Sequence, residues 1–270
     1  MIAGGICTHY EHPHCCPDTL SKRIGFEVTM TSVDDLVKWC RSKGLKDSRE
    51  YLKGIREWRQ AWRPKRVRVL LVAESHVGQQ KGDLKVRVRS PEGASKSLPP
   101  SYVRLVYCLG YGEDCLCEPN PKPNHGTWQF WKIFQAIKDC NADAKQPRKN
   151  EVMRKWKLLR ELQTKGVWLV DASVGALYST REGRLKIPNY RKSIEESFKK
   201  FVWPMIEKDS VEQIWVIGRR VGRALKGLRL EGMPNRITER WVISQPQDHD
   251  HERYRKDLKR LIKGISVCQS

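Results

Sequence analysis

The segment Arg66-Val-Arg-Val-Leu-Leu-Val-Ala-Glu-Ser-His-Val-Gly78 decides the fold that we expect for this chain of 270 residues. It is an unbroken apolar run bounded by a proline and a glycine, which is typical of a strand buried on both faces of a parallel sheet. The run ends in a carboxylate, Glu74. Because ligands of open α/β sheets bind at the carboxyl ends of the strands, Glu74, Ser75 and His76 are candidate site residues.

Three more short apolar runs each end in a small or polar residue: Gly166-Val-Trp-Leu-Val-Asp-Ala172, Gln213-Ile-Trp-Val-Ile-Gly218 and Arg240-Trp-Val-Ile-Ser-Gln-Pro246. Stretches with helical spacing of apolar residues alternate with them, at 128–137, 192–206, 219–225 and 251–262. This alternation predicts a three-layer αβα sandwich with a central four-stranded parallel sheet. A set of buried helices fits less well, because the runs are short and rich in Val, Ile and Trp.

The chain divides into two parts at the start of the first strand. Residues 1–62 form a Cys/His-rich start and a helical extension, with helices expected near 32–43 and 48–62, and residues 63–270 form the α/β domain. The section 82–124 has little regular pattern and is rich in Pro, Gly and charge. A long loop after the first strand is expected to carry function.

The net positive charge of the chain indicates the kind of molecule that it binds. Lys and Arg number 52 against 31 for Asp and Glu, which leaves a formal net charge of +21. That excess goes beyond what solubility needs and would hold a polyanion by counterion release, so DNA is the favoured partner. The sequence has neither an apolar stretch that could span a membrane nor a secretory apolar core at its start. We therefore expect a cytoplasmic monomer.

The nine cysteines of a basic intracellular protein are not expected to form a disulfide framework. Zinc would need four ligands at a recurring spacing, and neither group of cysteines shows such a pattern. We predict no cofactor and free thiols, with a structural zinc at the N-terminal cluster as the alternative. The N-terminal cluster comprises Cys7, His9, His12, His14, Cys15 and Cys16, and the second group comprises Cys108, Cys115 and Cys117.

Taken in order, the strand ends resemble motifs of the uracil-DNA glycosylase superfamily over roughly residues 66–263. The matching segments are Val72–Gly78, Gly126–Trp131, Gly166–Ala172, Ile214–Gly218 and Ser244–Gln247. The resemblance implies a monofunctional DNA glycosylase, which extrudes a nucleotide, hydrolyses its N-glycosidic bond and leaves an abasic site. Departure of the base leaves positive charge on the sugar, which a nearby carboxylate stabilises.

The resemblance gives Glu74 the role of that carboxylate, although a buried ion pair with an arginine is the competing interpretation. Gln245 stands where the family has a histidine that contacts base O2; its amide can donate there, or it is an ordinary loop residue. Ser75 and His76 are expected to bind substrate, with His76 either contacting phosphate or solvated. Tyr107 and Tyr111, ahead of Tyr102, are candidates for the aromatic platform that an extruded base needs. Four residues near the last two strands are predicted to bind DNA: Arg219, His249, His251 and Arg253.

Asp171 stands where the family has an asparagine that reads uracil. An ionised carboxylate only accepts hydrogen bonds, so it repels uracil O4 and accepts from cytosine N4. We expect burial to raise the pKa of Asp171 and to allow one proton to be shared with cytosine N3. A cap of a following helix is the alternative role.

Removal of ordinary cytosine would damage the host genome, so the predicted target is a modified cytosine. Glucosylated hydroxymethylcytosine in phage DNA is the example that the family analogy suggests, which implies a function in anti-phage defence. Two alternatives stay open: a repair glycosylase for uracil or a damaged base, and a non-catalytic DNA-binding module of the same fold.

Overall fold

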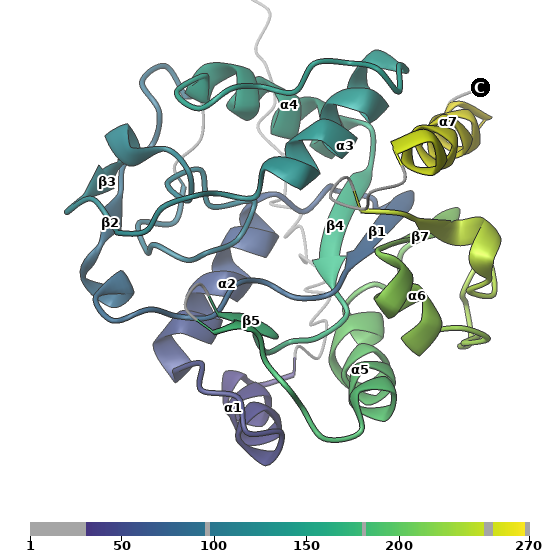
Figure 1. Cartoon of the computed structure of the whole chain (residues 1–270), viewed down its shortest axis with the longest axis horizontal. Helices are drawn as coiled ribbons and strands as arrows, with labels where there is room; N and C mark the ends of the chain where they lie inside the picture. Colours follow the sequence, from purple (N-terminus) through teal and green to yellow (C-terminus); the bar gives the residue numbers. More distant parts are fainter. Residues whose placement is uncertain (1–30, 95–97, 180–181, 246–250, 268–270) are drawn as a thin grey trace, which may run out of the picture.

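The computed structural model describes residues 31–94, 98–179, 182–245 and 251–267. Its centre is a parallel sheet of four strands in the order β4-β1-β7-β8 (Figure 1). The strands are β1 (Val69–Ala73), β4 (Val167–Asp171), β7 (Gln213–Ile217) and β8 (Val242–Ile243). The expected α/β class and four-stranded parallel sheet are thereby confirmed.

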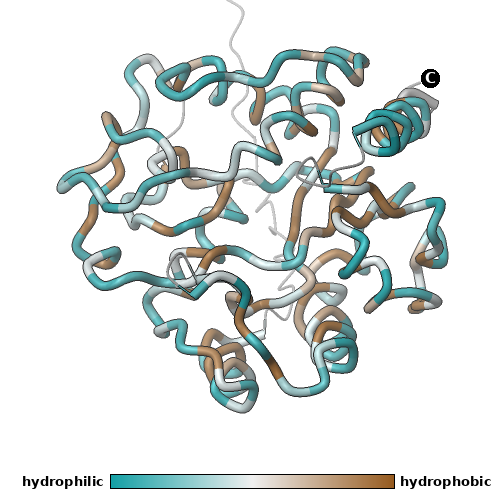
Figure 2. Tube along the Cα trace, viewed as in Figure 1, coloured by the Kyte–Doolittle hydropathy of each residue, from teal (hydrophilic) through white to brown (hydrophobic). Residues whose placement is uncertain are grey.

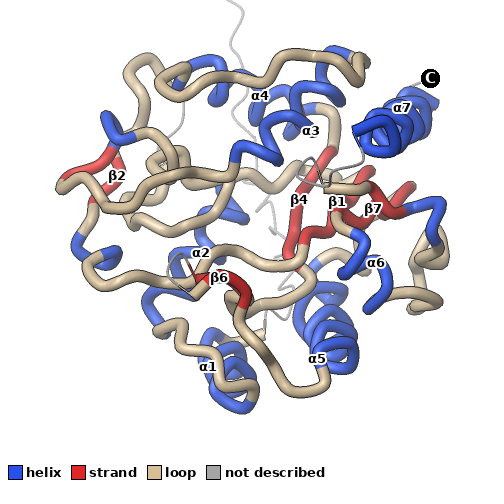
Figure 3. The backbone as a smooth tube through the Cα atoms, in the orientation of Figure 1, coloured by secondary structure: helices blue, strands red, loops and turns tan. Residues whose placement is uncertain are grey.

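Helices cover the sheet on both sides (Figures 1 and 3). One side carries α3, α4 and α7, where α3 packs on both other helices, and the other side carries α5 and α6, which pack on each other. The five helices are α3 (Trp128–Asp139), α4 (Val152–Thr164), α5 (Tyr190–Ser197), α6 (Arg219–Ala224) and α7 (His251–Val267). The arrangement is consistent with a three-layer sandwich.

The helix expected over 192–206 is shorter than its apolar spacing suggests. After α5 the chain forms a π-helical turn over Phe198–Val202 and then a 3-10 turn over Trp203–Met205. Pro204 lies in that last turn, where it has no backbone N–H to continue an α-helical ladder.

The two helices expected before the first strand are present as α1 (Val33–Ser42) and α2 (Arg49–Ala61). Each begins after a serine, Ser32 or Ser48, whose side-chain oxygen accepts a hydrogen bond from a backbone N–H of the first turn. Trp58 of α2 is fully buried in the same apolar core as the sheet. The described part of the N-terminal extension is therefore packed into the α/β core.

The section 82–124 is packed more closely than the expected long loop. It contains the short antiparallel strand pair β2 (Arg87–Val88) and β3 (Cys117–Glu118). Inside it, the buried guanidinium of Arg104 contacts Asp83 through two hydrogen bonds of 2.8 and 2.9 Å. A hairpin of β5 (Tyr178–Ser179) and β6 (Gly183–Arg184) follows β4.

Burial follows the apolar runs. Every residue of β1 and β4 is buried, as expected for strands covered on both faces. Figure 2 shows brown, hydrophobic segments along the central strands and teal, hydrophilic segments on the surrounding helices. Within the described ranges, no helix is both long and apolar enough to cross a lipid bilayer.

Candidate functional site

A cavity of about 270 Å³ lies at the carboxyl edge of the parallel sheet. Glu74 follows β1, Asp171 ends β4 and Gln245 follows β8, and all three line this cavity. The register pairs Ala73 with Asp171, so Glu74 emerges beside the end of β4. Ser75 and His76 also line the wall, so the parallel strands bring five of the predicted site residues together.

Glu74 is 5% exposed and is held by two donors from outside its own strand. The Tyr190 hydroxyl donates to Oε1 and the Arg184 guanidinium donates to Oε2, and each hydrogen bond is 2.6 Å long. Burial and the neighbouring Glu74 carboxylate both raise the pKa of Tyr190, which keeps its hydroxyl a neutral donor. The ion pair with an arginine, one of the two interpretations of Glu74, is present, and Glu74 itself lines the cavity.

Asp171 is 2% exposed and forms a buried ion pair with Arg59 of α2. His76 Nδ1 lies 3.6 Å from the same oxygen, Oδ2. Burial alone would raise the pKa of Asp171, but the charge of Arg59 and the His76 contact outweigh it and hold the pKa below its usual value. The expectation that burial raises the pKa of Asp171 is therefore wrong, because it left out Arg59, and the expected sharing of a proton with cytosine N3 loses that support. The helix-cap role is also wrong, since the next helix begins only at Tyr190.

His76 lies between two carboxylates. Its buried ring places Nε2 3.3 Å from Asp47 Oδ2, opposite Asp171. Burial disfavours the imidazolium, but the contacts with Asp171 and Asp47 outweigh it and raise the pKa of His76. A solvated His76 is thereby excluded. We call Asp47, Arg59, His76 and Asp171 the charge cluster.

Ser75 and Gln245 occupy two parts of the cavity wall. The Ser75 hydroxyl accepts a hydrogen bond from the backbone N–H of Leu177 and donates one to the His76 carbonyl, and each is 3.0 Å long. The bond from Leu177 connects the end of β1 to the chain after β4. Gln245 lies against Gly218, where a Cβ would be 3.1 Å from the Gln245 side-chain nitrogen. Gly218 has φ +100°, so both its backbone and this close approach favour glycine.

Tyr107 and Tyr111 do not line the cavity, and their assignment as the base platform is corrected. Tyr107 is buried beside the edge strand β4, where its hydroxyl accepts a hydrogen bond of 2.7 Å from the Leu169 backbone N–H. Tyr111 packs edge-on against Tyr102 at 6.3 Å, inside the 82–124 section. Both rings serve the core, because a buried tyrosine hydroxyl needs a local partner. Besides His76, the aromatic residues that do line the cavity are His125, Trp128, Phe130 and Tyr178.

The four predicted DNA-binding residues separate in space. Arg219 and Arg253 line a second, larger groove of about 730 Å³ between α6 and α7. His251 is exposed at the start of α7 and is absent from the walls of both the cavity and the groove. His249 lies outside the described residues.

Metal ligands were expected, if anywhere, at the N-terminal cluster, which lies outside the described residues. Among the residues that the structure describes, no group of three His, Cys, Asp or Glu side chains is placed to hold a metal ion. In the second cysteine group the thiols are free, with Cys108 and Cys117 buried and Cys115 exposed. Burial raises the pKa of Cys108 to about 12, so its thiol stays protonated.

Sequence reasoning missed the partners of the two cavity carboxylates. Arg59 carried a signal, because it follows Leu52 and Ile55 on the apolar face of α2 at i+7 and i+4. An arginine in an apolar stripe indicates a buried acidic partner. Asp47 and Arg184 lie in polar surroundings and carried no such signal.

Comparison with protein-family models, curated proteins and solved structures finds no match to this chain. The inference of function therefore depends on the site itself. Its main features are an ionised Asp171, a Glu74 held by two donors and a His76 enclosed by carboxylates.

Proposed function

We propose that this protein is a DNA glycosylase of the uracil-DNA glycosylase type, which accepts an extruded nucleotide in the strand-end cavity and hydrolyses its N-glycosidic bond. The observation that carries the proposal is the meeting of Glu74, Asp171 and Gln245, from three strands, around one cavity. Its volume of about 270 Å³ lies just below the ~300–1,000 Å³ of sites for drug-sized ligands, so one base with a substituent is the size of ligand that it would hold.

Asp171 supports a base that carries an amino group. Arg59 and His76 both contact Oδ2 and keep the carboxylate ionised, and an ionised carboxylate accepts hydrogen bonds but cannot donate them. In this role Oδ1 accepts from the exocyclic N4 of a cytosine-type base, and the same charge repels O4 of uracil. Gln245 would donate its amide N–H to base O2 from the other side of the cavity.

The reaction separates charge, and the cavity has groups of opposite sign for the two products. The bond between sugar C1′ and the base nitrogen breaks with its electron pair going to the base, while the oxygen of a water adds to C1′ and the proton that this water loses ends on the released base. Glu74 would stabilise the positive sugar and orient the water, with Arg184 and Tyr190 fixing its carboxylate.

His76 would offset the negative charge on the leaving base. Its buried Nδ1 lies 3.6 Å from Asp171 Oδ2 and makes no shorter hydrogen bond within the described residues, and the ring lines the cavity. The raised pKa of His76 favours an imidazolium there, which is the positive charge that Gln245 cannot supply.

The target that we propose is a modified cytosine, with glucosylated hydroxymethylcytosine of phage DNA as the example. The decisive experiment incubates the protein with DNAs that carry uracil, cytosine, hydroxymethylcytosine or glucosylated hydroxymethylcytosine, and identifies released bases by mass spectrometry. We expect release of a modified cytosine and none of ordinary cytosine. Release of uracil from DNA whose glucosylated cytosines stay intact would instead assign the protein to base repair.

One observation favours a second candidate, a non-catalytic DNA-binding module. Both cavity carboxylates have an arginine partner, Arg184 for Glu74 and Arg59 for Asp171, which reduces the charge that they present to a ligand. Such a module would bind all four DNAs and release no base. The same mass-spectrometric experiment, combined with a binding measurement, separates it from the enzyme.

A further inference from the structure

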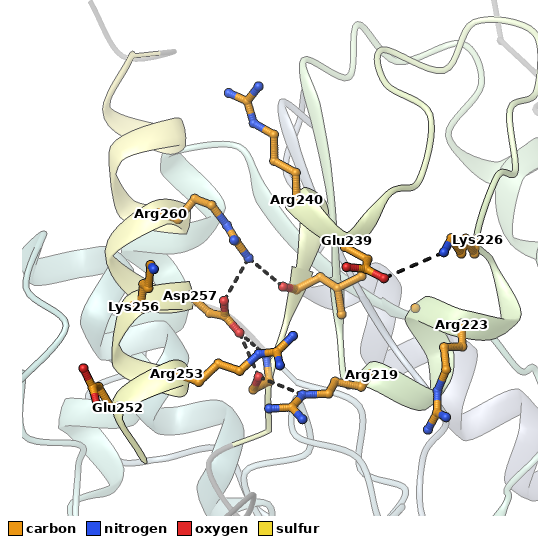
Figure 4. A pocket seen from close by; sticks show the side chains of 13 residues that line it. Arg219, Arg223, Lys226, Glu239, Arg240, Glu252, Arg253, Lys256, Asp257 and Arg260 are labelled. Carbon is orange, nitrogen blue, oxygen red and sulfur yellow. Dashed lines mark hydrogen bonds and ion pairs between the residues drawn. The ribbon is translucent and has the colours of Figure 1, made fainter. Parts of the chain in front are cut away.

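The groove between α6 and α7 differs from the catalytic cavity in size and charge. Its volume of about 730 Å³ is well above that of the cavity, and Figure 4 shows it walled by two helices with β8 at its floor. Seven basic and three acidic side chains line it. The basic ones are Arg219, Arg223, Lys226, Arg240, Arg253, Lys256 and Arg260, and the acidic ones are Glu239, Glu252 and Asp257.

Two rows of basic side chains face each other across the groove, one on α7 and the other on and just after α6. On α7, Arg253, Lys256 and Arg260 stand at i, i+3 and i+7, which places them on one face of the helix over about 10 Å. Figure 4 shows Arg219 and Arg253 extending toward each other from opposite walls. The positive charges of both walls are thus concentrated in one groove, which would attract a polyanion.

The acidic side chains neutralise only part of this charge. Asp257 accepts from the Ser244 backbone N–H over 2.9 Å and pairs with Arg260, and Glu239 lies 3.7 Å from Lys226. Within the described part of the chain, three lining residues have no acidic partner: Arg223, Arg240 and Lys256.

The floor of the groove is closed to a peptide strand. β8 is the edge strand of the sheet, and an open edge could add another strand. Here Arg260 donates to the Val242 carbonyl and Asp257 accepts from the Ser244 backbone N–H, so α7 covers these edge groups. Charge and covered edge together favour a polyanion over a β-strand ligand.

The groove and the cavity meet at consecutive residues. Ser244 lines the groove and Gln245 lines the cavity, while Ile217 lines the cavity two residues before Arg219 enters the groove. A strand whose base enters the cavity would therefore have its neighbouring phosphates within reach of the groove.

We propose that the α6–α7 groove binds the phosphodiester backbone of one nucleic-acid strand, beside the nucleotide that enters the cavity. The assignment rests on the proposed function and adds to it the path of the substrate strand. Basic side chains in two rows contact successive phosphates and give affinity without reading the base.

The test uses an unmodified, fluorescently labelled single-stranded oligonucleotide, so that binding is measured without any base release. The variant Arg223→Ala/Lys256→Ala removes two groove charges, and Arg41→Ala/Lys46→Ala removes two exposed charges on and after α1 as the matched control. Thermal unfolding verifies that both variants are folded. Fluorescence anisotropy then gives affinity between about 50 and 200 mM salt.

We expect the groove variant to flatten the slope of log affinity against log salt by about 1.4, or 0.7 for each lost phosphate contact, and the control to keep the wild-type slope. Equal slopes for the wild type and the groove variant would overturn the groove assignment. Tighter binding of inorganic tripolyphosphate than of the oligonucleotide would also overturn it, in favour of a small free polyphosphate. A groove effect without release of any base would refute only the glycosylase proposal.

Discussion

Arg59 and Asp171 form a buried ion pair that joins α2 to the end of β4. Each side chain is at most 9% exposed, so little water shields the pair. The helical extension before the first strand thus sets the charge state of the residue that we assign to base recognition. Asp47, which precedes α2, adds a second carboxylate to the charge cluster, where it contacts His76.

Replacement of Asp171 by Asn should change the base that the protein accepts. An amide at this position can donate to uracil O4, whereas the carboxylate repels it. We expect Asp171→Asn to lose about tenfold or more in release of the cytosine-type base, by the ~1–3 kcal/mol of one good base contact, and to gain release of uracil. A DNA that carries the modified cytosine and a DNA that carries uracil are incubated together with the protein. Mass spectrometry then measures the ratio of the two released bases. An unchanged ratio would mean that Asp171 does not read the base.

Removal of either partner of the Arg59–Asp171 pair should destabilise the fold more than removal of both. Arg59→Met leaves the buried Asp171 carboxylate with only the longer His76 contact, so the free energy of unfolding should fall by about 3–5 kcal/mol. In the double variant Arg59→Met/Asp171→Asn no buried charge of the pair remains, and the loss should be smaller than either single loss. Urea unfolding of the four proteins gives the coupling. Additive losses would show that the two charges act independently.

The raised pKa of His76 predicts a dependence of stability on pH. Because the folded-state pKa lies above the ordinary 6.5, the imidazolium stabilises the fold fully below pH 6.5, and this contribution is lost as pH rises through the folded-state pKa. The lowered pKa values of Asp47 and Asp171 have the opposite sign: their contribution is present above 3.8 and lost as pH falls through their folded-state values.

The free energy of unfolding should therefore be greatest between about pH 3.8 and pH 6.5. Urea unfolding across the pH range measures it, and His76→Gln should remove the decline on the alkaline side. His125→Gln, which changes an exposed histidine of the same cavity, is the matched control and should keep that decline. A decline that survives in His76→Gln would assign it to another group.

Glu74→Gln should separate chemistry from binding. The neutral amide keeps the shape of the side chain but cannot stabilise positive charge on the sugar, so abasic-site formation should fall by about a hundredfold or more. DNA affinity should stay within about twofold, a change of under 0.5 kcal/mol, because Glu74 contacts neither groove nor phosphate in our proposal. The control is Glu182→Gln, which changes an exposed carboxylate directly before β6, the strand that carries Arg184. Equal activity of Glu74→Gln and the wild type would exclude Glu74 from catalysis.

Trp128 should provide the stacking surface that Tyr107 and Tyr111 do not. Its side chain is 44% exposed and lines the cavity at the start of α3, so its exposed face can stack on a base. Trp128→Ala should weaken oligonucleotide binding by about 1–3 kcal/mol with little effect on unfolding. Leu84→Ala, at a similar exposure of 46%, is the control. Equal affinities of the two variants would mean that no base stacks on Trp128.

The periodicity of apolar residues predicted most of the fold. Runs rich in Val, Ile and Leu marked the four parallel strands, and i, i+3 spacing marked α3 and α7. α4 was not predicted, although Trp156, Leu159 and Leu162 carry the same spacing and are buried. Tyr107 and Tyr111 were misassigned because a tyrosine of the core and a tyrosine of a binding site look alike in sequence.

The sequence by itself determined that Glu74 and Asp171 share one edge of the sheet, because parallel strands of similar length end together. Only the tertiary structure decided the partners and the charge of these two carboxylates. Glu74 meets Arg184 across 110 positions, and Asp171 meets Arg59 across 112. The pKa of a buried group depends on the distances to neighbouring charges and on burial, and those distances exist only once helices, hairpin and sheet have packed together.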